Sequence, residues 1–149
     1  MRQINIGRRV GVWVAALTLV AFAAPVALGH TSTAPKLVGS PTAGKTVFSS
    51  TCITCHMITA VPGGGAIGPN LNKVNPALDE NTIIKAVTCG GTAVMTKAAV
   101  AKYTTTMVSY APPALTQTQI TNVAAFIFSA THPKGSVPKV AVSKTLPKC

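Results

Sequence analysis

The run Cys52-Ile53-Thr54-Cys55-His56 constrains this chain more than any other stretch of its sequence. Two thiols separated by two residues and followed directly by a histidine form a pattern typical of covalent c-type haem attachment. In that chemistry the thiols bond to the haem vinyl groups as thioethers, and the histidine ligates the iron. One turn of helix brings all three groups to one side of a flat ring. The run therefore predicts one covalent haem c, attached through Cys52 and Cys55, with His56 as an iron ligand.

Two other chemistries use a Cys-x-x-Cys pair, and the rest of the sequence favours neither. A redox-active dithiol follows a strand in a βαβ unit, and a zinc site needs a second, closely spaced pair of ligands. The remaining cysteines, Cys89 and Cys149, are far apart and form no such pair. Haem is therefore the favoured interpretation, with the dithiol and the zinc site as alternatives.

The first 29 residues are typical of an export signal. Three arginines precede an apolar stretch, residues 10–28, and Ala27-Leu28-Gly29 offers the small residues that a cleavage site needs. Cleavage there leaves about 120 residues. The apolar stretch is also nearly long enough to span a bilayer, so an uncleaved membrane anchor is the alternative. In both cases the sequence predicts a periplasmic protein, in a compartment where disulfides persist.

The charge balance predicts the kind of partner. The chain has 13 Lys and Arg against 2 Asp and Glu, and beyond the leader ten lysines oppose Asp79 and Glu80, a net charge of +8. A lysine-rich surface steers a protein toward redox partners with acidic docking surfaces. Nucleic acid is a poor candidate, because the lysines are scattered, no arginine follows the leader, and export removes the protein from the genome.

The shortage of acidic residues also bears on the solvent. Acid denaturation is mostly the protonation of carboxylates that are paired in the native state. With two acidic side chains there is little to protonate. We therefore hypothesise an acidic periplasm; the alternative is drift toward a basic isoelectric point in a small exported protein.

The first helix of the folded part is expected to begin at Pro41. Residues 30–40 precede it as a flexible lead-in, Ser40 is a suitable N-cap, and proline suits the first helical position. The helix is predicted to run into Cys52. Its apolar stripe consists of Ala43, Val47 and Phe48.

Three further helices are expected downstream. One spans residues 75–89, starts at Asn75-Pro76 or at Asn81, and is stopped by Gly90-Gly91. A short helix is predicted around residues 98–103. The last and strongest begins with the capping box Thr116-Gln117-Thr118-Gln119 and ends at His132-Pro133. Its apolar face consists of Ile120, Val123, Ala124, Ile127 and Phe128.

The loop Gly68-Pro69-Asn70-Leu71 follows His56 at a distance that suits a second role. A ligating imidazole usually donates its other N–H to a carbonyl, which a proline-containing loop beneath the haem can present. Taken alone, the loop is equally well a simple turn. Together with the Cys-x-x-Cys-His run, however, it makes the segment from Gly44 to Thr131 resemble the class I c-type cytochromes, small haem proteins that carry electrons.

This resemblance implies an all-α cytochrome c fold, with three to five helices around one covalent haem and an extended C-terminal tail. It implies that Gly44 and Phe48 lie where the first helix crosses the last, with Phe126 packing at the same place. It also implies that the Pro69 carbonyl holds His56.

The segment Met107-Val108-Ser109-Tyr110 resembles the Met-Pro-x-Phe segment that carries the axial thioether in this family. The resemblance implies Met107 as the second axial ligand of the iron, although valine stands where proline is usual. Met95 is the rival, because it also follows a Gly-Gly pair. His132, His30 and an open site are the remaining alternatives.

Residues 133–149 form a tail that extends beyond the usual end of the family. Its last residue, Cys149, needs a partner in an oxidising compartment, and Cys89 is the only thiol left after haem attachment. We predict a Cys89–Cys149 disulfide that ties the tail to the body. Two free thiols, or an intermolecular bridge through Cys149, are the alternatives.

The predicted organisation is a signal peptide or anchor over residues 1–29, the lead-in, a cytochrome c domain over 41–132, and the tail. The predicted function is single-electron transfer between respiratory redox partners. No catalytic acid, base or nucleophile is apparent, so an enzyme is not expected. The alternatives are a membrane-anchored haem subunit of a larger respiratory complex and a haem enzyme, such as a peroxidase, with an open sixth site.

Overall fold

The structure is a computed structural model that describes residues 37–74, 78–132 and 142–149. The chain divides into two units, Met1–Thr31 and Ser32–Cys149, and every described residue belongs to the second. The predicted export signal, most of the lead-in and residues 133–141 of the tail lie outside the described residues. Within the described ranges, no helix combines the length and apolar character needed to cross a membrane.

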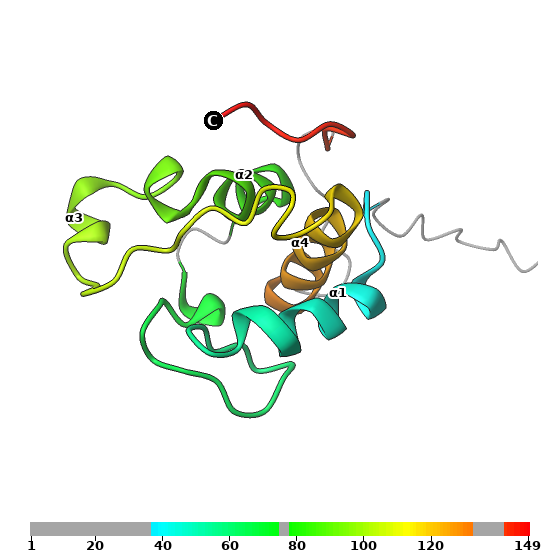
Figure 1. The fold of residues 1–149 in the computed structure, drawn as a ribbon. Helices are drawn as coiled ribbons and strands as arrows, with labels where there is room; N and C mark the ends of the chain where they lie inside the picture. Colours follow the sequence, from blue (N-terminus) through cyan, green and yellow to red (C-terminus); the bar gives the residue numbers. More distant parts are fainter. Residues whose placement is uncertain (1–36, 75–77, 133–141) are drawn as a thin grey trace, which may run out of the picture. The chain divides into compact units, whose positions relative to one another are not determined.

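The described part of the second unit is helical (Figure 1). Among its residues there is no strand, only an isolated bridge between Ile58 and Val61. The fold class is therefore all-α, as predicted. In chain order the elements are α1 (Pro41–Val47), the π-helical turn η1 (Phe48–Cys52), the 3₁₀ turn η2 (Leu71–Lys73), α2 (Glu80–Cys89), the 3₁₀ turn η3 (Gly91–Ala93), α3 (Lys97–Val100) and α4 (Gln117–Thr131).

Helix α1 begins as predicted and then widens. The Ala43 N–H donates to the Ser40 hydroxyl oxygen at 3.3 Å, and Pro41 occupies the first turn. From Phe48 the chain continues as the π-helical turn η1, which ends at Cys52. Ala43 is exposed, so its predicted place on the buried stripe was wrong. Gly44 is buried instead, because that side of α1 faces α4.

The crossing of α1 and α4 depends on Gly44, which lets the two backbones meet. A methyl group on Gly44 would lie 1.9 Å from the backbone oxygen of Asn122 and 2.8 Å from Cβ of Phe126, both well inside contact distance. Phe48 and Phe126 pack beside it, with ring centroids 5.5 Å apart. This confirms the crossing expected from the family resemblance.

The residues just before α1 are fixed to two helices. The Ser40 N–H donates to Oδ1 of Asn122 in α4 at 2.8 Å, and the Val38 N–H donates to Oε1 of Glu80 in α2 at 3.3 Å. The last residues of the predicted lead-in, 37–40, thus have contacts with the helices, while residues 30–36 lie outside the described residues. Backbone N–H groups need hydrogen-bond partners. Here the partners are side chains of α2 and α4, which the local sequence does not identify.

Helix α2 begins at Glu80, which is after the predicted start at Asn75-Pro76 and one residue before the predicted start at Asn81. Asp79 is its N-cap: the carboxylate accepts the Thr82 N–H at 3.0 Å and the Thr82 hydroxyl at 2.6 Å. A start at Asn75-Pro76 was wrong, because Asp79 has extended backbone angles; residues 75–77 lie outside the described residues. The end at Cys89 is as predicted, with Gly90 at a φ of +89°.

The last two helices differ in how well the sequence predicted them. Helix α3 is a single turn capped by Thr96, shorter and earlier than the predicted residues 98–103. Helix α4 has the predicted capping box between Thr116 and Gln119, and His132 is its C-cap. All five residues of its predicted apolar face are buried.

The tail is tied to the helices by a disulfide, as predicted. Cys89 and Cys149 are bonded, with their Cα atoms 5.4 Å apart. The Ser143 N–H donates to Oδ1 of Asn81 at the start of α2 at 3.0 Å, and Nε2 of Gln117 in α4 donates to the Lys144 oxygen. Val142 and Leu146 pack against the core, so the described tail contacts both α2 and α4.

Candidate haem centre

One turn of the chain carries Cys52, Cys55 and His56. Cys52 is the last residue of η1, and its carbonyl oxygen accepts the N–H of Cys55 at 3.1 Å and the N–H of His56 at 2.9 Å. Cys52 is half-buried and packs against the core, and the other two side chains are also partly exposed. The three groups therefore lie where the core meets solvent.

The His56 ring is oriented by Pro69. Its Nδ1 lies 3.0 Å from the Pro69 carbonyl oxygen, which can only accept a hydrogen bond. Nδ1 therefore carries the proton, and the lone pair of Nε2 is available to a metal. This is the contact that the family resemblance implied for Pro69.

Gly68 completes the seat of the imidazole, a role the sequence analysis did not assign. A Cβ on Gly68 would lie 2.6 Å from Cε1 and 2.9 Å from Nδ1 of His56, so the ring occupies the space of a side chain. The loop is held by the Gly68 N–H, which donates to the Cys55 oxygen at 2.8 Å. A glycine directly before the proline was the signal available in the sequence.

The two alternatives to haem do not suit this geometry. Burial, and then the neighbouring Cys55, raises the pKa of the Cys52 thiol to about 11, whereas a reactive dithiol needs a lowered pKa. In the described part of the chain, no three His, Cys, Asp or Glu side chains are grouped so as to hold a metal ion. Cys52, Cys55 and His56 therefore do not converge on one point, as zinc ligands must.

The segment Met107–Tyr110 packs against the same core as Cys52. Partial burial, and then the charges of Cys52 and Cys55, raises the pKa of the Tyr110 hydroxyl. Met107 packs against the core together with Tyr110. The electrostatic influence of the two cysteines on Tyr110 was not predicted from the sequence.

The structure also places the rival ligands. Met95 and Met107 border the same glycine: a Cβ on Gly91 would lie 3.6 Å from Sδ of Met95 and 3.1 Å from Cβ of Met107. His132 stacks on Phe128 with ring centroids 3.9 Å apart, and its Nδ1 lies 2.9 Å from the Phe128 oxygen. His30 lies outside the described residues.

A comparison with protein families decides the class of the protein. The family model described as Cytochrome c matches residues 41–131, more than half of the chain. The chain belongs to the cytochrome c family. Members of this family bind haem c covalently and are generally electron carriers, so this cytochrome is a haem-based electron carrier. No curated protein and no solved structure gives a significant match.

The side chains of this cytochrome fit a haem. Two thiols on one turn, an imidazole with Nε2 available and the thioether of Met107, which packs against the same core as Cys52, form the donor set that such a group requires. The matched region ends at residue 131, before the tail that carries Cys149. The disulfide is therefore formed with a segment outside the matched region.

Proposed function

We propose that this cytochrome carries single electrons outside the cytoplasm with one haem c, attached through Cys52 and Cys55. His56 and Met107 are the proposed axial ligands. The observation that carries this proposal is the 3.0 Å contact between His56 Nδ1 and the Pro69 oxygen. When bound, the haem iron alternates between its ferric and ferrous states and so takes up and releases one electron at a time.

The protein's own residues set the conditions for that exchange. The Pro69 carbonyl fixes the imidazole and raises the basicity of its Nε2, and Gly68 leaves room for the ring. A neutral thioether from Met107 favours ferrous iron and raises the reduction potential. The chain's two acidic side chains lie at the start of α2, where Asp79 is the N-cap and Glu80 is buried, so neither is proposed as a catalytic acid or base.

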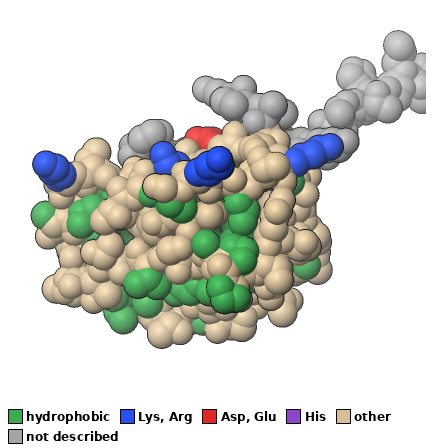
Figure 2. Space-filling view, turned by 45° about the horizontal axis from the view of Figure 1, so that its top comes forward, with side chains coloured by type: hydrophobic (Ala, Val, Ile, Leu, Met, Phe, Trp, Pro, Cys, Tyr) green, Lys and Arg blue, Asp and Glu red, His purple; other side chains and the backbone are tan. Residues whose placement is uncertain are grey.

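A periplasmic location and respiratory partners belong to the same proposal. The leader supports export, and the oxidised Cys89–Cys149 pair suits an oxidising compartment. All described lysines are exposed, which supports partners with acidic docking surfaces. These lysines are Lys45, Lys73, Lys85, Lys97, Lys102, Lys144 and Lys148. Figure 2 shows a face on which lysine side chains follow one edge, while hydrophobic side chains gather below it.

The optical spectrum of the native protein tests the proposal. We expect a covalent c-type haem, and in the ferric state the weak near-infrared band of methionine-ligated iron. Met107→Ala should abolish this band, whereas the matched change Met95→Ala should leave it. A high-spin ferric spectrum without the band would instead favour the enzyme with an open sixth site, and the absence of haem would refute the proposal.

The apolar stretch over residues 10–28 favours a second candidate, a membrane-anchored haem subunit of a larger respiratory complex. The two candidates differ in the fate of the leader. Mass spectrometry of the purified protein distinguishes them: an intact leader in the membrane fraction supports the subunit, and a mature N-terminus near His30 in the soluble fraction supports the carrier.

A further inference from the structure

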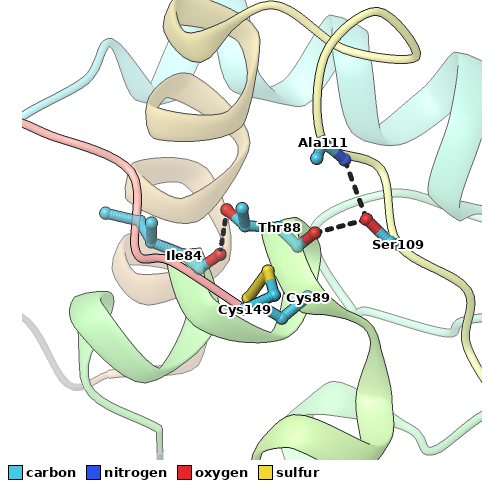
Figure 3. Close-up of a disulfide and its surroundings, with 6 residues drawn as sticks. All are labelled: Ile84, Thr88, Cys89, Ser109, Ala111 and Cys149. Carbon is cyan, nitrogen blue, oxygen red and sulfur yellow. Dashed lines mark hydrogen bonds between the residues drawn. A yellow bond between two sulfur atoms is a disulfide. The ribbon is translucent and has the colours of Figure 1, made fainter.

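The segment Met107–Tyr110 caps the C-terminal end of α2. An α-helix leaves its last four carbonyl oxygens without helical partners. Two of these receive donors from the segment: the Val87 oxygen accepts the Tyr110 N–H at 2.9 Å, and the Thr88 oxygen accepts the Ser109 hydroxyl at 2.5 Å (Figure 3). Beyond the helix, the Gly91 N–H donates to the Met107 oxygen at 3.0 Å.

The contact is close enough to involve the backbone itself. A Cβ on Gly90 would lie 2.8 Å from the Met107 oxygen, and one on Gly91 would lie 3.1 Å from Cβ of Met107. The Ser109 hydroxyl oxygen also accepts the Ala111 N–H at 3.2 Å. A single side chain thus joins the end of α2 to the chain that follows the methionine.

Cys89 lies in the middle of this contact. It follows Thr88 and precedes Gly90, and Figure 3 shows the disulfide, Thr88 and Ser109 at the same end of α2. Helix ends open more readily than helix centres. The bond to Cys149 ties this end to a tail that is itself hydrogen-bonded to the start of α2 and to α4. Opening of the last turn of α2 therefore requires movement of the tail as well.

We propose that Ser109 and the Cys89–Cys149 disulfide act together as a clamp that positions Met107 toward the iron. This inference rests on the proposed function, in which Met107 is an axial ligand. The members of the clamp are positioning residues: without them the helices and the covalent haem remain, but an external ligand replaces Met107 more easily. A disulfide that only restricts the unfolded chain changes global unfolding and leaves ligand exchange in the folded protein unaltered.

Imidazole binding to the ferric haem protein measures this exchange. Loss of the near-infrared methionine band reports displacement of Met107, and far-ultraviolet circular dichroism reports the helices. We expect Cys89→Ser/Cys149→Ser and Ser109→Ala to bind imidazole about tenfold more tightly than the wild type, with unchanged helix content. Ser109→Thr keeps the hydroxyl and should restore the wild-type affinity. Ser129→Ala is the matched control, because it removes a similar hydroxyl bond at the end of α4.

A chemical version of the experiment avoids any failure of the double variant to fold. A dithiol gives two electrons and two protons to the disulfide, forming two thiols and becoming a cyclic disulfide itself. The thiols are then alkylated with iodoacetamide and the iron is reoxidised with ferricyanide. This protein should also bind imidazole about tenfold more tightly than the untreated one.

The outcomes separate this inference from the function on which it rests. Wild-type imidazole affinity in Ser109→Ala and in the alkylated protein would overturn the clamp and leave the carrier intact. A wild-type protein without the methionine band would overturn the ligation by Met107, and the clamp with it.

Discussion

The His56 ring contacts two neighbouring residues of one loop, the carbonyl oxygen of Pro69 and the backbone of Gly68. The first contact fixes the rotation of the ring through its Nδ1 proton. The second requires that no side chain be present. Orientation of the proximal ligand is therefore set by backbone atoms, which makes it sensitive to a single added methyl group.

Gly68→Ala should disturb this ligand. A Cβ 2.6 Å from Cε1 displaces the imidazole or the loop, and overpacking of this kind costs about 1–3 kcal/mol. We expect a lower urea midpoint for the haem protein and a larger high-spin fraction in its ferric spectrum. Ala66→Val, at an exposed position of the same loop, is the control and should change neither. An unaltered spectrum in Gly68→Ala would show that the ring tolerates the methyl group.

Glu80 is the other residue whose surroundings are unusual. It is 0% exposed; Oε1 accepts the Val38 N–H, and Oε2 has no partner among the described residues. Burial, only partly offset by the Val38 hydrogen bond, raises the pKa of this carboxyl. Relative to the unfolded chain, the folded protein therefore favours the protonated form of Glu80.

The sign of this shift gives a pH prediction. A raised pKa in the folded state contributes stability that is complete below the unfolded pKa and is lost as the pH rises through the folded pKa. Glu80→Gln should therefore gain stability relative to the wild type between pH 4 and pH 7. Urea unfolding of the haem protein at both pH values measures this difference.

Asp79→Asn is the matched control for Glu80→Gln. Partial burial raises the pKa of Asp79, but the hydrogen bonds from Thr82 outweigh it and lower the pKa overall. The sign is opposite and the affected pH range is lower: the stability from Asp79 is complete above the pKa of the unfolded chain and is lost as the pH falls below it, so Asp79→Asn should keep a nearly constant stability difference from the wild type between pH 4 and pH 7. A pH trend shared by both variants would contradict the assignment of the effect to burial of Glu80.

At the scale of the elements, the crossing of α1 and α4 positions the haem motif. The chain passes from this crossing through Phe48 directly into η1 and Cys52. Any change that separates α1 from α4 is therefore transmitted to the attachment cysteines over a few residues.

Gly44→Ala should separate the two helices. The added methyl would lie 1.9 Å from a backbone oxygen of α4, and a backbone cannot yield as a side chain tip does. Overpacking by one methyl group typically lowers the free energy of unfolding by about 1–3 kcal/mol. This loss exceeds the stability gained from the higher helix propensity of alanine. Urea unfolding should show this loss. Thr46→Ala, at an exposed position of α1, should stay near the wild-type stability, and equal midpoints for the two variants would refute the role of the crossing.

At the scale of the whole molecule, the main property is its charge. The full chain carries a formal charge of +11, or +8 once the leader is removed, and this charge acts on partners over about 10 Å at an ionic strength of 0.1 M. We expect the reaction with an anionic reagent such as ferricyanide to slow as salt is added, and that with a cationic cobalt complex to accelerate. Stopped-flow rates over a salt series, with a neutral reagent as control, test this, and the opposite slopes would contradict the proposed acidic partners.

The sequence by itself determined the local features of this cytochrome. The Cys52–His56 run, the caps at Ser40 and Thr116, and the apolar face of α4 all follow from residues a few positions apart, where spacing fixes geometry. The crossing at Gly44 and the Pro69 contact were found through resemblance to a family. The disulfide was found because Cys89 was the one thiol left for Cys149.

Only the tertiary structure decided which distant groups meet. Asn122 and Glu80, which are far along the chain, accept the backbone N–H groups of Ser40 and Val38. Helix α2 begins at Glu80 because the Asp79 side chain caps it there. Ala43 is exposed because the side of α1 that carries Gly44 faces α4 instead. The contact of Met107 with Gly91 depends on chain closure over many residues, which periodicity and spacing do not encode.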